Sequence, residues 1–491
     1  MTPQLGLLKF RCISSYPGRV RASTCVTINI AIHIFLFSIL AEQVSAQDKI
    51  AITLPEALET GIKNYPSIKA KTNYMDAAHA LTLNARNEYL PNVIGSVQQS
   101  YGTVNGQYGP AAPIGVLSVS SSGPPASQQS WNAAFGGLYI VSTTWEAFTF
   151  GRIRSRVQLA ASQERQNSAD LDQEQFIQRV KISSAYLNLI IARQLVESGK
   201  SNLLRAQTVQ QTVKARTLSG LNPGVDSTLA NADVSKAKLL LIDFMTNEKT
   251  IQRQFAESLG LSTPWDFQPD TIPFDRIPEI VQANSIVAQN PQLLFYRARI
   301  DYANQLITTT KKSLMPGVTL FGMYQGRGSG FSSSYNPENL NGYSNGYQNG
   351  INPTRFNYVA GVSLTWNLMS PFKIRQQVIA QRFTTSGYQA EYDQLKNQLQ
   401  NQLILSDQKI ENTLLSAHEA PVQFKAALEA YTQKGTMYKN GLATMVDLQQ
   451  AMYVLNRAEI DRSVAYVNVW LALLTKAAAS GDFNLFINQT H

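Results

Sequence analysis

The sequence predicts an α+β membrane protein in which β-strands, four per chain, join a membrane β-barrel that is continued by a long α-helical barrel. Three observations predict this fold: an internal duplication, helical stretches of nearly 70 residues, and strands with one apolar face. Charged residues make up only 15% of the 491 residues, against roughly 25% in an average globular protein. The polar residues are mainly uncharged, which suits long solvated helices and the wall of a water-filled pore.

The N-terminus has the features of an export signal, which we place at residues 1–46. Arg19 and Arg21 precede an apolar stretch, Val26 to Leu40, and small residues at Val44-Ser45-Ala46 favour cleavage before Gln47. An uncleaved anchor is the alternative, but the stretch is shorter than the roughly 20 residues of a membrane-spanning helix. We therefore expect an exported protein.

Both cysteines, Cys12 and Cys25, precede the expected cleavage site. The mature chain then has neither thiol chemistry nor disulfides, whatever the redox state of its compartment.

The rest of the chain contains one unit written twice. Five landmarks recur at an offset of 225 residues in the early part and 221 in the later part: Asn64-Tyr65-Pro66 with Gln289-Asn290-Pro291, Leu90-Pro91 with Met315-Pro316, Thr144-Trp145 with Thr365-Trp366, Gly220-Leu221 with Gly441-Leu442, and Val225-Asp226 with Val446-Asp447. The offset changes between residues 101 and 135, within a predicted loop, where insertions are tolerated. A period this long indicates a duplicated domain half.

The first repeat, residues 47–260, opens with a helix that Thr53 and Glu56 can cap. Its expected elements are a helix over 53–89, a strand over 92–103, a loop over 104–130, a strand over 132–147, a helix over 151–219, a turn at 220–224 and a return helix to 259.

Residues 261–277 form a Pro-rich linker, because the prolines there forbid a continuous helix. The second repeat, residues 278–480, is expected to contain a helix over 278–314, a strand over 316–326, a loop over 327–355, a strand over 356–368, a helix over 372–439, a turn at 441 and a return helix to 480. Residues 481–491 form a C-terminal tail.

The strand prediction is clearest at 356–368, where every even position is apolar and most odd positions are polar. Aromatic residues lie near both ends of this strand, as in the girdles of membrane barrels. The matching strand places Phe135, Tyr139, Val141 and Trp145 on one face. A half-buried sandwich strand is the alternative for any one strand, and the four strands together with the export signal favour the barrel.

Helix lengths and strand number decide the architecture. A helix over 151–219 is about 100 Å long. The two short helices of each repeat, placed end to end, match one long helix. Four strands cannot enclose a lumen, and an open sheet leaves unpaired backbone groups in lipid. The chain must therefore associate with copies of itself, and two, three or four copies all satisfy this argument.

Several motifs resemble those of the TolC-type outer membrane efflux protein family. They are Leu54-Pro55-Glu56-Ala57 with Asn64-Tyr65-Pro66 after it, Leu90-Pro91 before a strand, and Tyr438-Lys439-Asn440-Gly441 with Val446-Asp447-Leu448 after it. Each motif is weak alone, but their order, spacing and duplication are specific, and the resemblance covers nearly all of the mature chain.

This resemblance implies a homotrimer in the outer membrane, with a 12-stranded β-barrel and a helical tunnel across the periplasm. It implies the passive exit duct of a tripartite efflux or type I secretion system, which docks to a periplasmic adaptor (membrane fusion) protein and an inner-membrane RND or ABC transporter. The resemblance also places the adaptor contact at the helical turns: Gly220, Leu221, Gly441 and Leu442.

The resemblance further implies a constricted periplasmic entrance, closed by a polar network and ringed by acids. Tyr438 matches the closing network, Asp447 matches the acidic ring, and Asp226 is the counterpart of Asp447 in the first repeat. The family pattern has a second acid where this chain has Gln450 and a basic residue where it has Ala443. Asp447 could instead cap the return helix, where a carboxylate is favourable, and Tyr438 could simply pack between adjacent helices.

Nothing in the sequence resembles an active site, so we expect no enzyme activity, no cofactor and no metal. The three histidines after the signal have no metal-ligand spacing: His79, His418 and His491. Basic residues are scattered despite the formal charge of +9, which argues against nucleic-acid binding. A surface-displayed coiled-coil structural or adhesive protein is the alternative function, although such a stalk needs no amphipathic strands.

Overall fold

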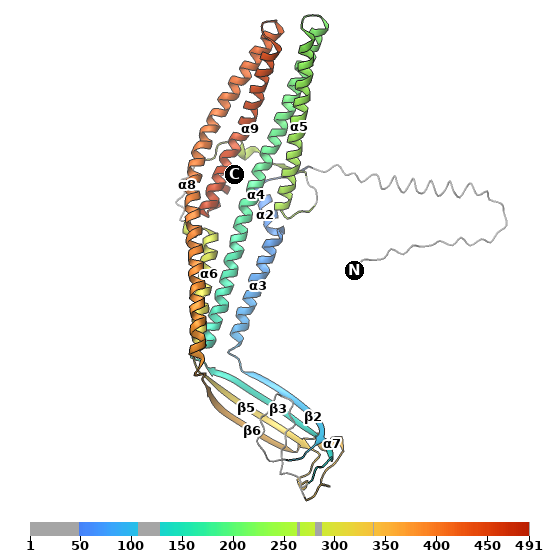
Figure 1. Ribbon diagram of the computed structural model, residues 1–491, viewed down its shortest axis with the longest axis vertical. Helices are drawn as coiled ribbons and strands as arrows, with labels where there is room; N and C mark the ends of the chain where they lie inside the picture. The colour runs from blue at the N-terminus through green and yellow to red at the C-terminus, as the bar shows by residue number, and fades with distance from the viewer. Residues whose placement is uncertain (1–48, 107–127, 263–265, 280–286, 337, 491) are drawn as a thin grey trace, which may run out of the picture.

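The computed structural model describes residues 49–106, 128–262, 266–279, 287–336 and 338–490, so the predicted signal peptide lies outside the described residues. The chain forms an elongated column of helices with a β-sheet at one end (Figure 1). None of the described helices combines the length and the apolar character that a membrane span requires.

Two very long helices span the column, and the other long helices pack on them. Helix α4 contacts α2, α3 and α5, and helix α8 contacts α6 and α9. The bounds are α2 (Leu54–Asn64), α3 (Pro66–Asn87), α4 (Arg152–Leu218), α5 (Gly224–Ser258), α6 (Pro291–Lys312), α8 (Ser370–Lys439) and α9 (Met445–Ser480), with short helices α7 (Tyr347–Ile351) and α10 (Asn484–Ile487). The long helices and the return helices agree with the sequence prediction to within a few residues.

The first helix of each repeat was predicted too long. The helix expected over 53–89 is two helices, α2 and α3, separated at Tyr65, whose ψ of 122° is the extended conformation that a following proline imposes. The helix expected over 278–314 begins only at Pro291, where the Asn290 side chain accepts a hydrogen bond from Gln292 N at 3.0 Å. Residues 280–286 lie outside the described residues.

The end-to-end arrangement of the short helices is confirmed, and glycines make it possible. Gly260, two residues after the end of α5, lies against Asn64 at the break between α2 and α3. Gly481, directly after the end of α9, lies against Asn290 at the start of α6. Both glycines have positive φ, 72° and 81°. The duplicated Pro motif and the duplicated helix-ending Gly therefore meet in space in each repeat.

The sheet at the end of the column is antiparallel with strand order β2-β3-β5-β6. Its strands are β2 (Asn92–Thr103), β3 (Ala133–Phe148), β5 (Gly317–Ser329) and β6 (Arg355–Thr365). The two repeats join where β3 pairs with β5. The described parts of the loops expected over 104–130 and 327–355 lie at the far end of the sheet, and the second loop includes α7 (Figure 1). Residues 107–127 of the first loop lie outside the described residues.

The register gives the sheet one apolar face and one mainly polar face. Residues directly opposite each other share a face, and Trp145 lies opposite Leu320, which lies opposite Val362. The face that contains Trp145 carries Val93, Val97, Tyr101, Phe135, Tyr139, Val141, Val318, Tyr324, Phe356, Tyr358 and Leu364. The other face carries Ser96, Gln98, Ser100, Ser142, Thr144, Thr319, Gln325, Asn357, Ser363 and Thr365 among some apolar residues. The alternation predicted from sequence is confirmed.

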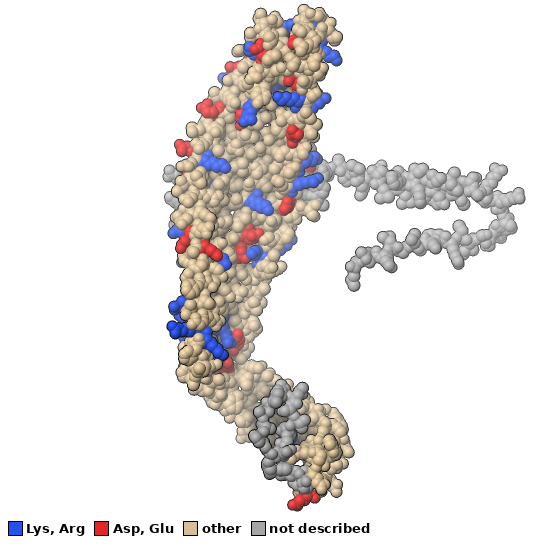
Figure 2. Space-filling model, viewed as in Figure 1, with Lys and Arg blue, Asp and Glu red and all other residues tan. Residues whose placement is uncertain are grey.

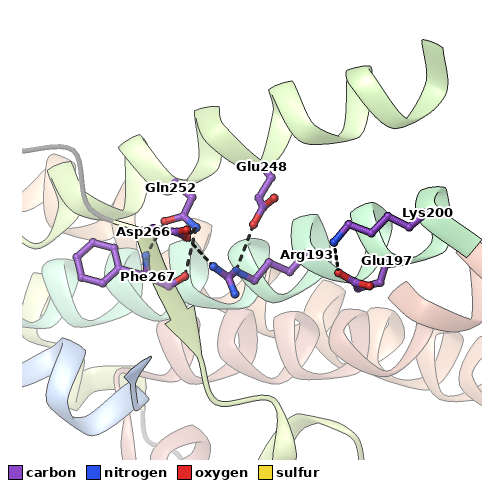
Figure 3. Close-up of polar contacts among 7 residues, drawn as sticks. All are labelled: Arg193, Glu197, Lys200, Glu248, Gln252, Asp266 and Phe267. Carbon is purple, nitrogen blue, oxygen red and sulfur yellow. Dashed lines mark hydrogen bonds and ion pairs between the residues drawn. The ribbon is translucent and has the colours of Figure 1, made fainter. Parts of the chain in front are cut away.

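A second, parallel pair of strands was not predicted: β1 (Lys49–Ile52) with β4 (Asp266–Pro269). Strand β4 lies in the segment predicted as a linker. Arg193 of α4 forms ion pairs with Glu248 of α5 at 3.2 Å and Asp266 of β4 at 2.8 Å (Figure 3). The Gln252 side chain accepts from Phe267 N at 2.9 Å and donates to Phe267 O at 3.2 Å. These contacts fix β4 against the helical column.

The largest apolar core lies at this level, halfway along the column. Tyr186, Phe255, Phe274 and Trp470 are fully buried there, and Phe274 contacts both Tyr186 and Trp470. The Tyr186 hydroxyl donates to Ile52 O at 3.0 Å and accepts from Asp270 N at 2.8 Å. The core therefore holds α4, α5, α9 and the short strands together as one body.

Candidate functional site: the paired helical tips

The end of the column opposite the sheet consists of two helical hairpin tips that lie side by side (Figure 1). In the first tip α4 turns into α5, and in the second α8 turns into α9. Leu221 N donates to Arg216 O at 2.9 Å, and the matching Leu442 N donates to Met437 O at 2.8 Å. Gly220 and Gly441 have φ of 74° and 75°, the left-handed conformation that this helix-ending motif requires.

Each tip presents apolar side chains to solvent. Leu221 is 69% exposed and its counterpart Leu442 is 71% exposed. Val225 and Val446, each the second residue of a return helix, are also mainly exposed. Four large aliphatic side chains at duplicated positions are therefore exposed at the end of the column.

A polar network, centred on the Asn222 side chain, joins the first tip to the second. Asn222 Oδ1 accepts from Arg216 Nε at 2.9 Å. Asn222 Nδ2 donates to Asp226 Oδ2 at 2.7 Å and to the Tyr438 hydroxyl at 2.8 Å. Arg216 also donates to the Lys439 carbonyl and lies over the Tyr438 ring at 5.8 Å. One side-chain amide therefore links α4, α5 and α8, because its oxygen and its nitrogen both form hydrogen bonds.

An apolar cluster lies directly behind this network. Tyr438 is 3% exposed and packs with Val213, Val234, Met445 and Leu448. Burial, with a smaller contribution from the Asp226 carboxylate, raises the pKa of Tyr438 above its usual range. The phenol therefore stays protonated and uncharged in the network at any physiological pH.

Asp447 takes part in a different arrangement, the reciprocal cap of α9. Thr444 N donates to Asp447 Oδ2 at 3.0 Å, while Asp447 N donates to Thr444 Oγ1 at 3.2 Å. Lys434 Nζ lies 3.7 Å from Asp447 Oδ1. The Thr444 N–H, then its hydroxyl and the Lys434 charge, lower the pKa of Asp447. The carboxylate nevertheless remains 44% exposed, so it caps the helix and still faces solvent.

The structure brings together two of the three residues predicted at the entrance. Asn222 bridges Tyr438 and Asp226, whereas Asp447 lies apart with Thr444 and Lys434. Sequence reasoning missed Arg216 and Asn222. Arg216 is a basic residue in the last turn of α4. The basic residue expected two positions after Gly441 is absent, because that position is Ala443. The only sign of the network in the sequence was a polar residue, Asn222, in the turn between two helices.

Among the described residues, no group of three or more His, Cys, Asp or Glu could hold a metal ion. No family model matches the chain, and no curated protein sequence matches it. Solved structures do match. The Campylobacter jejuni CmeC outer membrane channel is 12% identical, with a TM-score of 0.71, over 87% of this chain and 85% of that chain.

Two further structures match over nearly their whole length. The Vibrio cholerae outer membrane protein VceC is 15% identical, with a TM-score of 0.68, over 87% of this chain and 96% of that chain. The open state of the Neisseria gonorrhoeae MtrE outer membrane channel is 15% identical, with a TM-score of 0.67, over 87% and 88%. The chain has the TolC-type channel fold. Because the sequence identities are low, the similarity to these structures establishes the fold alone. It confirms, for the fold, the resemblance found in the sequence.

Proposed function

We propose that this protein is the outer membrane exit duct of a tripartite efflux or type I secretion system, and that it works as a homotrimer. The observation that carries the proposal is the sheet with one apolar face at the end of a helical column. Helix α4, with 67 residues, is about 100 Å long, enough to reach across a space as wide as the periplasm. Apolar strands suit lipid, and the polar face suits a water-filled lumen.

The trimer follows from the sheet edges together with the fold. Strands β2 and β6 are at the edges of the four-stranded sheet, and their outer backbone groups have no partner within the sheet. In lipid such groups cost several kcal/mol each, so the edges must pair with strands of other copies. Three chains of this fold give a closed barrel of 12 strands. Among two, three or four copies, the TolC-type fold favours three.

The paired tips are the proposed contact with a periplasmic adaptor protein. Leu221 and Leu442 stand out from the end of the column, where an adaptor that continues the duct would meet them. Their duplicated positions offer each chain two similar contacts. The adaptor would in turn connect the duct to an RND or ABC transporter of the inner membrane.

The Asn222 network is the proposed latch of the periplasmic entrance. It ties α8 to the first hairpin, so separating the hairpins would break the bonds to Tyr438 and to the Lys439 carbonyl. Asp447 is the proposed acid at the entrance, because its carboxylate stays exposed and ionised while it caps α9. A narrow neck ringed by three such carboxylates would favour cations.

In-cell cross-linking tests the docking proposal. A photo-cross-linking residue is placed at Leu221 or Leu442 in living cells, and at exposed Leu239 in α5 as a control. We expect a periplasmic protein to be captured from both tips and not from the control, and an inner-membrane pump to co-purify with it. Capture from the control alone, or a captured protein unrelated to transport, would contradict the proposal.

A further inference from the structure

Cations gather where the helical column meets the sheet. Three of the four helix ends next to the sheet carry clustered cations: Arg152, Arg154 and Arg156 at the start of α4, Lys311 and Lys312 at the end of α6, and Lys373 and Arg375 at the start of α8. The antiparallel sheet brings these ends together, since β3 leads into α4, α6 leads into β5 and β6 leads into α8. At 1.5 Å per residue, all seven lie within about 10 Å of the helix ends.

Acidic partners are scarce in this collar of seven cations. Glu146 is paired with Arg152 at 2.8 Å and Glu88 with Arg156 at 3.0 Å. Arg154, Lys311, Lys312, Lys373 and Arg375 have no ion pair within the described part of the chain. Figure 2 shows blue side chains concentrated at this end of the column. The five cations without an ion pair therefore give the collar a net positive charge.

Apolar and aromatic side chains lie beside the collar on the side of the sheet. Trp145 donates its indole N–H to Tyr89 O at 2.8 Å, and Trp366 donates to Leu314 O at 3.0 Å. Phe148 and Phe372 are exposed close by. Amphipathic rings with a bonded polar edge typically lie at the boundary between hydrocarbon and headgroups. The strands beyond them are uncharged over their middle, with charges only at Glu146, Arg327 and Arg355.

We propose that the collar binds the headgroups of anionic phospholipids in the membrane leaflet that faces the helical column. The proposal rests on the proposed membrane insertion of the sheet. If the Trp145 and Trp366 rings lie at the hydrocarbon boundary, the first turns of α4 and α8 lie at the depth of lipid phosphates. Lys and Arg at a membrane surface favour anionic lipid by about fivefold for each cation engaged. The collar thus fixes the depth of the duct and recruits a ring of anionic lipid.

Lipid selectivity of the reconstituted full-length protein tests this proposal. The protein is placed in bilayers of phosphatidylethanolamine and phosphatidylcholine with a trace of spin-labelled phosphatidylglycerol or spin-labelled phosphatidylcholine. Electron paramagnetic resonance then gives the relative association of the two probes with the protein. We expect wild type to prefer phosphatidylglycerol by about fivefold or more, and this preference to fall as salt rises from 0.1 M to 1 M.

The variant K311Q/K373Q/R375Q removes three of the five unpaired cations, leaves Arg154 and Lys312, and is expected to lower the preference several-fold. A matched variant, K214Q/K238Q/K249Q, removes three exposed lysines far from the sheet and should keep the wild-type preference. The salt series on wild type needs no variant, so the proposal stays testable if the triple variant does not assemble. No preference in wild type, or the same preference in the collar variant, would overturn it.

Conductance separates this proposal from the proposed function. Wild type that forms channels in neutral bilayers, yet shows no lipid preference, would overturn the collar and leave the duct standing. A collar variant that changes the ratio of anion to cation current, while the lipid preference is unchanged, would place these cations in the lumen and would also overturn the lipid site.

Discussion

A single amide side chain, that of Asn222, connects the two hairpins of the chain at their tips. It accepts from Arg216 and donates to Asp226 and to the hydroxyl of Tyr438, so each polar atom of the amide has a partner. The hydroxyl of Tyr438 is the only atom of α8 in this set of three bonds. The phenol oxygen is thus the smallest group whose removal weakens the proposed latch.

Tyr438→Phe removes that oxygen and keeps the buried ring. The lost hydrogen bond is worth about 1 kcal/mol, so we expect the ratio of open to closed entrance to rise about fivefold in single-channel recordings. Tyr431→Phe is the matched control, because Tyr431 packs in the same cluster and its hydroxyl has no hydrogen-bond partner in the described structure. Equal opening of wild type and Tyr438→Phe would exclude the latch.

Asp447 is expected to act as an ionised acid even at low pH. Its pKa is lowered from the ordinary value of 3.8, chiefly by the Thr444 N–H. The capping stability it gives is therefore fully present above pH 3.8 and is lost as pH falls through the lower, folded value. In planar bilayers we expect cation preference to persist down to about pH 4 and to weaken in Asp447→Asn, but not in the control Asp243→Asn.

Two results would contradict this view of Asp447. An unchanged cation preference in Asp447→Asn would remove the residue from the pore. A preference that is already half lost well above pH 4 would mean that repulsion among three carboxylates outweighs the cap, because like charges raise a pKa.

At the scale of elements, the sequence predicts those whose signals are local or periodic. The period of two along β6 and the unbroken helical stretches of α4 and α8 needed no tertiary information. The elements that were missed depend on distant contacts. Strand β1 has four residues and pairs with β4, which is 217 residues away along the chain, so no turn signal marks either strand. The break at Tyr65 was readable from Pro66 and was overlooked in a long polar helix.

The site was predictable only in part, for the same reason. Tyr438, Asp226 and Asp447 came from a resemblance, and the tip glycines came from the duplication. Asn222 bonds to Tyr438 and Arg216 bonds to the Lys439 carbonyl, in each case across more than 200 residues, and a single sequence does not reveal such contacts.

Substitutions at two glycines with the same backbone conformation distinguish the cost of backbone strain from the cost of a steric clash. Gly441 and Gly481 have φ of 75° and 81°, so either Ala substitution incurs the left-handed cost of about 1–2 kcal/mol. A methyl group on Gly481 would also lie 2.4 Å from Cα of Asn290, whereas nothing lies within 4 Å of one on Gly441. We expect Gly481→Ala to lower the unfolding temperature clearly more than Gly441→Ala. Equal effects would contradict the tight junction between α9 and α6.

The two faces of the sheet predict opposite tolerance to charge at neighbouring positions of β6. Val362 lies on the apolar face and Ser363 on the polar face. Lysine on a lipid-facing strand costs about 2–4 kcal/mol near the middle of the membrane, and far less in a wet lumen. We expect Val362→Lys to reduce the amount of assembled protein in the membrane fraction strongly, and Ser363→Lys to leave it nearly unchanged. The reverse order would show that the faces are assigned the wrong way round.

At the scale of the whole molecule, one chain does not close a β-barrel. One copy supplies a curved column and a four-stranded sheet with two free edges. In the proposed assembly the free edges pair with other copies, and the apolar face of the sheet contacts lipid. The duplication gives each copy two similar hairpins, so the tips of three copies would present six related contacts to a partner.

The mass of the detergent-extracted protein, measured by native mass spectrometry, tests this requirement most directly. We predict three copies of the chain in one particle, because three four-stranded sheets of this fold close a barrel of 12 strands. A stable particle that contains a single chain would contradict it.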